Sequence, residues 1–201
     1  MKIPLFPLDA VLYPGAALPL HIFEERYKEM AGECIARHTV FGVVRAQSEG
    51  LAVVGCTARV ARVLERHSDG RFDLLCEGME RFEIQMLDES RTFLQAEVDF
   101  FNDDGRDASR AQKEECVGLH FEILELTGAP AEGVSLDLDE PISFRLASTV
   151  PADLGFKQVL LCLRSDAERT EQLMEYYNAL LPKLRRGAQA NRAAARRGHV
   201  M

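Results

Sequence analysis

The 201-residue sequence has no apolar run that approaches the length of a membrane-spanning helix. Its apolar amino terminus is interrupted by prolines and by Asp9, and no small-residue cleavage site follows, which argues against a secretory signal. The cysteines form an odd set, and no pair has CxxC spacing. The five cysteines are Cys34, Cys56, Cys76, Cys116 and Cys162. Because Cys56, Cys76 and Cys162 have apolar neighbours, we expect reduced, buried thiols in a soluble cytoplasmic protein.

Acidic residues outnumber basic ones outside the carboxyl terminus. The formal net charge is −8, yet the chain from Pro182 onward contains six Lys or Arg residues and no acid, which leaves −14 for the preceding body. An acidic body disfavours nonspecific binding to nucleic-acid phosphates. The basic tail is the one part of the chain whose charge favours such binding.

Proline, in contrast, is concentrated in the first twenty residues, at Pro4, Pro7, Pro14 and Pro19. Proline fixes φ and has no backbone N–H, so this segment is predicted to contain neither a helix nor a central strand. We expect short extended pieces separated by bends, with a tight turn at Tyr13-Pro14-Gly15.

Strand periodicity dominates as far as about residue 101. β-branched or alternating apolar residues predict strands within 39–44, 52–65, 72–86 and 93–101. The Asp69-Gly70 pair predicts a hairpin turn after His67. Only residues 23–37 have a helical pattern. Several short strands with one helix predict a β-barrel or a strongly curved sheet.

Beyond that region the period becomes helical. The first helix is predicted to stop at Gly128, and further helices are expected from about residues 139, 153 and 165. Pro182 is expected to end or bend the last one. The predicted organisation is a β-barrel subdomain (1–101), a polar linker (102–109), a helical subdomain (110–186) and a mobile basic tail (187–201).

Four patterns follow one another along the chain. They are a Pro-rich segment at Ile3–Leu8 that leads through Pro14-Gly15 to Pro19–Tyr27, an FGVV strand at Phe41–Val44, a G-x-x-R-φ step at Gly78–Phe82, and a KQ-x-LL segment within Asp153–Leu161 with Arg169 further on. Together, over roughly residues 1–181, they resemble the amino-terminal, substrate-binding domain of Lon-type ATP-dependent proteases. The resemblance implies an α+β fold, with a PUA-like β-barrel followed by a C-terminal helical bundle. It also implies recognition of protein segments.

Catalytic motifs are missing. Full-length Lon proteases continue into an ATPase module and a Ser–Lys protease module, whereas this sequence has no G-x-x-x-x-G-K-[ST] phosphate loop and no Gly-Lys pair. It ends before such modules could fit, so we expect no enzymatic activity and no cofactor.

Cys116 and His120 are spaced to form half a metal site, but a zinc site needs three or four ligands. No metal site is predicted, and packing is the favoured interpretation of this pair.

Candidate binding residues are taken mainly from the opening segment. They are Phe6, Tyr13, His21, Phe23, Glu24, Arg26, Tyr27 and Arg81. A structural interpretation is favoured for several of them, because partly buried charges usually come in pairs. Under it, Glu24 pairs with Arg26 or with Arg81, and the Tyr27 ring plugs one end of the barrel. Gly15 and Gly78 are interpreted as sites that need a special backbone conformation.

Three functional hypotheses remain. The first is a non-catalytic module that binds unfolded or degron-bearing polypeptides, with a protease or chaperone as a further partner. The second is an RNA-binding PUA-like protein that uses the basic tail, which the acidic body disfavours. The third, ranked last, is an enzyme whose catalytic groups meet only in the fold. The resemblance to the Lon domain, together with the missing ATPase and protease motifs, favours the first. If apolar residues of the opening segment are exposed together, they would mark its protein-binding surface.

Overall fold

The computed structural model describes residues 1–130 and 136–198, and these fall into two compact units. The first unit combines Met1–Asn102 with Ala152–Cys162. The second combines Asp103–Pro151 with the chain from Leu163 onward. Within the described residues, no helix is both long and apolar enough to cross a membrane.

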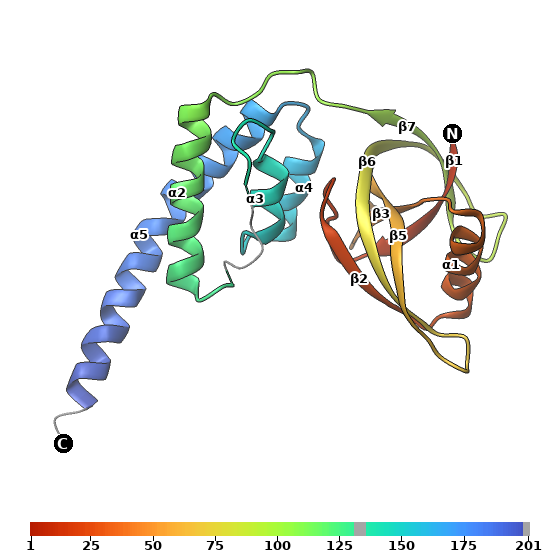
Figure 1. Cartoon of the computed structure of the whole chain (residues 1–201), viewed down its shortest axis with the longest axis horizontal. Coiled ribbons are helices and arrows are strands. Elements are labelled where there is room, and N and C mark those ends of the chain that lie inside the picture. The colour runs from red at the N-terminus through yellow and green to blue at the C-terminus, as the bar shows by residue number, and fades with distance from the viewer. Residues whose placement is uncertain (131–135, 199–201) are drawn as a thin grey trace. The chain divides into compact units, whose positions relative to one another are not determined.

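A mixed sheet of seven strands forms most of the first unit (Figure 1). The strands are β1 (Lys2–Leu8), β2 (Ala17–Ile22), β3 (Phe41–Gln47), β4 (Gly50–Leu51), β5 (Val54–Arg66), β6 (Phe72–Asp88) and β7 (Gln95–Phe101). Five strands pair in the order β1-β7-β6-β5-β3, and a parallel pairing of β1 with β3 closes the ring. Because β2 pairs with β6 and β4 with β3 outside this ring, the barrel is irregular. The α+β class is confirmed, with the sheet-rich part before most of the helices.

The prediction that the prolines exclude a central strand was wrong for β1, which pairs on both sides. Its first half, with Pro4, pairs with β7, and its second half, with Pro7, pairs with β3. The strand therefore changes partner between Pro4 and Leu5. Each half therefore has a paired neighbour on one side only, which is a position that tolerates proline as an edge strand does. The amide of Leu5 still donates to the carbonyl oxygen of Leu94, at 2.8 Å.

The predicted hairpin turn after His67 is confirmed. The amide of His67 donates to the carbonyl of Arg71 at 2.9 Å, and Gly70 has a φ of 85°. This positive φ is the conformation for which glycine is suited. The turn joins the two longest strands, β5 and β6. It therefore sets the register of β5 against β6.

The single helix predicted in the amino-terminal half is α1 (Glu25–Arg37). Its buried residues recur at helical spacing, as Tyr27, Met30, Ala31 and Cys34. The helix ends at His38, which adopts the left-handed conformation with φ 54°.

Four of the five cysteines are buried as expected, whereas Cys162 is exposed, so the prediction was wrong for that thiol.

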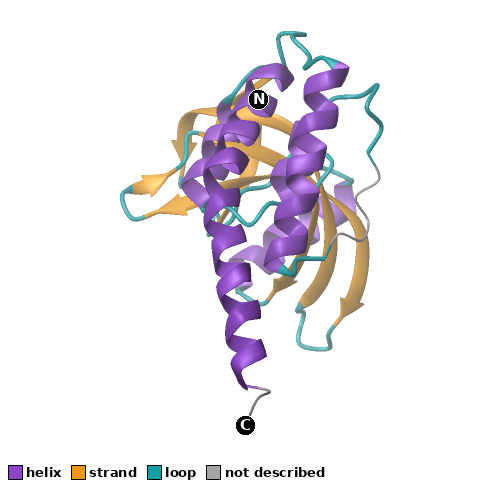
Figure 2. Ribbon diagram, turned by 90° about the vertical axis from the view of Figure 1, so that its left-hand side faces the viewer, coloured by secondary structure: helices purple, strands orange, loops and turns teal. Residues whose placement is uncertain are grey.

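The second unit consists of helices α2 (Arg110–Thr127), α3 (Ser143–Thr149) and α5 (Asp166–Gly198), with α2 and α5 alongside each other (Figure 2). Helix α2 begins with a capping box between Ser109 and Gln112 and ends at Gly128 with φ 69°. The predicted stop of this helix is therefore confirmed. Helix α3 begins a few residues later than the sequence predicted.

Helix α5 continues through Pro182, where the sequence predicted an end or a bend, and is helical as far as Gly198. Packing on both sides of the proline accounts for this. Leu181 is buried just before it. Just after it, the guanidinium of Arg185 donates two hydrogen bonds to the carboxylate of Glu122, at 2.6 and 2.8 Å. This packing offsets the one backbone hydrogen bond that a proline removes.

Helix α4 (Leu154–Cys162) belongs to the first unit, although it lies within the range predicted to be a helical subdomain. Its polar groups bond to the sheet-rich part. The Gln158 amide donates to the carbonyl of Val54 at 2.9 Å. The carbonyls of Lys157 and Leu161 accept hydrogen bonds from Tyr13 and Arg81. These contacts are between residues about a hundred positions apart, so local periodicity could not reveal them.

Candidate functional site

The candidate binding residues separate into a buried and an exposed group. Phe6, Tyr13, Tyr27 and Arg81 are buried. The exposed ones are His21, Phe23, Glu24 and Arg26, which lie at the end of β2 and the start of α1. We call these four residues the β2–α1 patch. Only this group is accessible to a partner.

The buried tyrosines have structural contacts. The Tyr13 hydroxyl donates to the carbonyl oxygen of Lys157 at 2.8 Å, and only 1% of the residue is exposed. The Tyr27 ring packs edge-on against Phe6, with centroids 4.5 Å apart. Burial raises the pKa of the Tyr27 phenol, which keeps it neutral. Both side chains thus belong to the framework beneath the β2–α1 patch.

Arg81 does not pair with Glu24, as one interpretation of the sequence required. Its guanidinium lies 4.6 Å from the centre of the Phe101 ring and donates to the carbonyl of Leu161 at 3.1 Å. Glu24 instead forms a local salt bridge with Arg26, at 2.8 Å. Arg81 therefore holds α4 against the strands and is not available to a ligand.

The most exposed apolar residue of the β2–α1 patch is Phe23, with 60% of its surface accessible. Its ring stacks beside that of His21, at a centroid distance of 6.0 Å. Arg26 lies over the Tyr27 ring at 4.5 Å. The patch thus combines an accessible aromatic ring with neighbouring polar and charged groups, a composition that is enriched in protein-binding surfaces.

A hollow of about 400 Å³ adjoins this patch through Arg26. It is lined by Pro7, Arg26, Tyr27, Glu89, Arg91, Thr92 and Leu94. The charge of Arg91 is neutralised by Glu29 and Glu33, at 2.7 and 2.5 Å. The lining is therefore partly apolar and nearly balanced in charge. Such a lining suits an uncharged peptide segment better than a phosphate.

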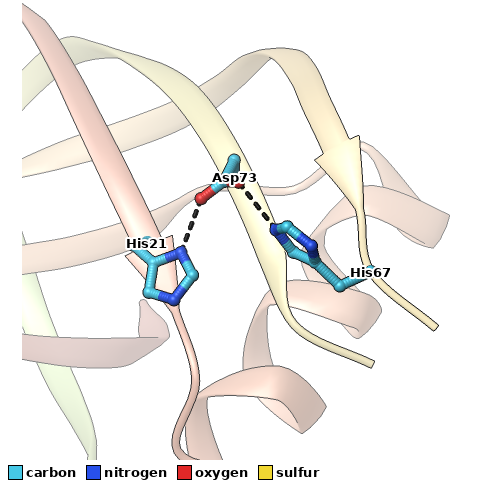
Figure 3. Close-up of side chains that lie close together, drawn as sticks. All are labelled: His21, His67 and Asp73. Atoms are coloured by element: carbon cyan, nitrogen blue, oxygen red, sulfur yellow. Dashed lines mark hydrogen bonds and ion pairs between the residues drawn. The ribbon is translucent and has the colours of Figure 1, made fainter. Parts of the chain in front are cut away.

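The structure also brings together His21, His67 and Asp73, which the sequence did not connect (Figure 3). His21 Nδ1 and His67 Nε2 lie 2.6 and 2.7 Å from the two carboxylate oxygens of Asp73. These hydrogen bonds lower the pKa of the Asp73 carboxyl, the bond from His21 contributing most. The hairpin turn could have signalled the closeness of His67 to Asp73. The pairing of β2 with β6 that adds His21 has no local signal.

The Cys116 and His120 pair is buried in the second unit, and both residues have other partners. His120 Nδ1 lies 2.8 Å from the Tyr177 hydroxyl, and its Nε2 lies 3.1 Å from that of Thr149. The Cys116 thiol lies 4.0 Å from the carbonyl of Thr170. The geometry agrees with the packing interpretation.

The buried imidazole of His120 predicts an acid-sensitive step in stability. Burial lowers its pKa to about 4, whereas an imidazole in an unfolded chain has a pKa near 6.5. Between these values the unfolded state binds more protons, so acidification destabilises the fold, by on the order of 3 kcal/mol in total. Urea unfolding across this pH range should show a shallower loss for His120→Gln than for the original protein. The exposed His38→Asn control should keep the original slope, and an unchanged slope in His120→Gln would contradict the assignment.

Comparison with known proteins accounts for the fold. The family model described as the ATP-dependent protease La (LON) substrate-binding domain matches residues 2–179. The chain belongs to this family. The LON substrate-binding match includes both structural units and nearly all of the described helices and strands.

Curated relatives of this LON domain are full-length proteases. The chain is 26% identical to Lon protease of Parabacteroides distasonis over 194 residues, covering 88% of this chain and 24% of that protein. It is 28% identical to Lon protease 2 of Myxococcus xanthus over 190 residues, covering 79% of this chain and 23% of that protein. The chain thus spans about a quarter of the length of these relatives.

Solved structures support the same assignment. A Lon N-terminal domain protein from Xanthomonas campestris has a TM-score of 0.71 and 26% identity, covering 88% of this chain and 98% of that one. The N-terminal domain of a Mycobacterium avium complex Lon protease has a TM-score of 0.65 over 89% of this chain and 98% of that one. Because its identity is 16%, that second likeness shows the fold alone.

Proposed function

We propose that this LON substrate-binding domain recognises unfolded or degron-bearing polypeptide segments and has no hydrolytic activity of its own. The observation that carries the proposal is the family match over residues 2–179, together with the β2–α1 patch. The 201 residues contain no phosphate-binding loop of the G-x-x-x-x-G-K-[ST] type. In this proposal a separate protease or chaperone in the cytoplasm acts on the bound polypeptide.

Phe23 is the proposed anchor for an apolar side chain of the substrate. An unfolded polypeptide differs from a folded one by exposing apolar side chains, so a module that selects it needs accessible apolar surface. Phe23 supplies such surface, and His21 supports its ring on one side. The adjoining hollow, with its nearly balanced charges, provides room for the neighbouring residues of the segment.

Replacing Phe23 by Ser should weaken polypeptide binding roughly ten- to a hundredfold, because burial of one aromatic side chain contributes about 1.5–3 kcal/mol. The measurement is fluorescence anisotropy with a labelled, reduced and carboxymethylated protein as an unfolded probe. Because Phe23 is largely exposed, the fold should be retained. This can be checked by circular dichroism.

Phe100→Ser is the matched control, since Phe100 is the other exposed phenylalanine of the described first unit and lies on β7. It should bind the probe as the original protein does. Equal losses in both variants would contradict the assignment to the β2–α1 patch. An original protein that does not bind at micromolar concentration would overturn the proposed function. Salt-sensitive binding of labelled RNA in its place would favour the RNA hypothesis.

A further inference from the structure

Two histidines and one aspartate meet at the edge of the sheet where β2 ends. Their nearest donor atoms, His21 Nδ1, His67 Nε2 and an Asp73 oxygen, all lie within 4.8 Å of one another. The side chains are 46%, 24% and 31% exposed, so an ion from solvent can reach them. Among the described residues this is the one group of three or more His, Cys, Asp or Glu with such spacing.

The backbone holds these residues in place independently of their side chains. His21 and Asp73 are direct partners in the antiparallel pairing of β2 with β6, so their side chains project from the same face. The hairpin turn holds His67 through two backbone hydrogen bonds. Its amide N–H donates to the carbonyl oxygen of Arg71, and its carbonyl oxygen accepts from the amide of Gly70 at 3.0 Å. The cluster therefore sits on paired strands and a closed turn, as a preorganised site requires.

The donor set suits a borderline transition-metal ion. Imidazole nitrogen and carboxylate oxygen together are ligands typical of Zn²⁺, which has three protein ligands and a water molecule at an open site. An ionised carboxylate only accepts hydrogen bonds, so each imidazole nitrogen that faces Asp73 carries a proton. A dication that binds here replaces the proton on each imidazole nitrogen that faces Asp73. The displaced proton moves to the other nitrogen of the same ring, or it is released to solvent if that nitrogen is already protonated.

The three side chains would have to adjust to hold an ion. Ligand atoms around a tetrahedral zinc ion lie about 3.3 Å apart, given metal–ligand distances near 2.0–2.1 Å. The hydrogen-bonded distances here are 2.6 and 2.7 Å, so these pairs would have to separate by about 0.6–0.7 Å, and any ligand atoms near the 4.8 Å limit of the cluster would have to move closer. Both movements are open to side chains that are partly exposed. Glu65 Oε1 lies 3.6 Å from His67 Nδ1, the ring nitrogen that faces away from Asp73. A carboxylate in that position orients a metal-bound histidine.

We propose that His21, His67 and Asp73 form a three-ligand site for a divalent transition-metal ion of the Zn²⁺ class, with water completing the coordination. The ion links the end of β2 to the β5–β6 hairpin. It also fixes the His21 ring, against which Phe23 stacks. The site shares His21 with the β2–α1 patch, but ion binding does not depend on polypeptide binding.

The test is calorimetric titration of the EDTA-treated full chain with Zn²⁺, with Co²⁺ absorption in the visible range as a second readout of ligand geometry. One ion should bind per chain. His67→Ala and Asp73→Asn should both lose this binding, and Glu65→Gln should weaken it roughly tenfold. Zn²⁺ should raise the melting temperature of the original protein and leave that of His67→Ala unchanged.

Two controls separate this site from other metal-binding groups. His38→Asn removes an exposed histidine elsewhere and keeps a residue that tolerates its left-handed backbone. Cys162→Ser removes the exposed thiol. Both should bind Zn²⁺ as the original protein does. The proposal is overturned if the original protein binds no Zn²⁺, if His67→Ala and Asp73→Asn retain binding, or if either control abolishes it.

Discussion

Replacing Asp103 by Asn is expected to lower the free energy of unfolding of the second unit by about 3–5 kcal/mol, the usual cost of removing one partner from a buried ion pair. The variant keeps the size and shape of the side chain and removes only its charge. Its partner, Arg169, cannot lose its proton in compensation, because a guanidinium stays charged in proteins. An uncompensated charge then remains inside the helical unit.

The surroundings of Arg169 explain the size of this effect. The side chain has no exposed surface. It donates to the two oxygens of Asp103 at 2.8 and 2.5 Å and to the Ser143 hydroxyl at 2.7 Å. It also donates to the carbonyl of Leu163 and stacks over the Phe144 ring at 3.8 Å. The guanidinium thus joins the segment before α2 to α3 and α5, and Asp103 supplies the negative charge.

The neighbouring residue provides a matched control. Asp104 pairs with Arg106 at 2.6 Å on the surface, where the Arg106 side chain is 62% exposed. Asp104→Asn should change stability by less than about 1 kcal/mol, as is usual for exposed pairs. Urea unfolding followed by circular dichroism measures both variants. Similar small effects at the two positions would show that the Asp103–Arg169 pair is not the strong contact that its geometry indicates.

Local signals in the sequence were sufficient where the chain makes its own contacts. The hairpin turn after His67 was predicted because Asp69-Gly70 specifies a backbone conformation within four residues. The end of α2 at Gly128 was predicted for the same reason. The resemblance to the LON family supplied the overall class, which periodicity alone left open between a barrel and a curved sheet.

Non-local pairing was not predictable from the sequence. Pro4 and Pro7 argued against a central strand, and only the change of partner along β1 reconciles them with one. Pro182 argued for a helix end, and the packing of α5 on α2 overrides that preference.

The candidate site shows the same limit. Local sequence indicated most of the candidate binding residues within the opening segment, but it could not show which of them are exposed. The cluster of His21 with Asp73 depends on the register of β2 against β6, which joins residues 52 positions apart. Arg81 likewise finds its partner in Leu161, 80 positions away. Contacts of this kind arise from tertiary packing and leave no periodic pattern.

Gly78 illustrates a sequence feature whose physical reason appears only in the fold. Its φ is not positive, so the expected need for a special backbone conformation holds for Gly15, with φ 74°, and not for Gly78. The need at Gly78 is for space. Its amide donates to the carbonyl of Ala16 and its carbonyl accepts from Gly15, both at 2.8 Å. These bonds bring the turn before β2 directly against the middle of β6.

Gly78→Ala is therefore expected to destabilise the first unit by about 3 kcal/mol, at the upper end of the usual cost of overpacking. A Cβ atom there would lie 2.1 Å from the carbonyl oxygen of Tyr13, and a backbone atom cannot rotate away as a flexible side chain can. Gly32→Ala is the matched control, because no atom lies within 4 Å of its Cβ position in α1. Alanine should stabilise that helix by about 1 kcal/mol. Thermal unfolding should thus shift in opposite directions for the two variants, and a neutral Gly78→Ala would contradict the close approach.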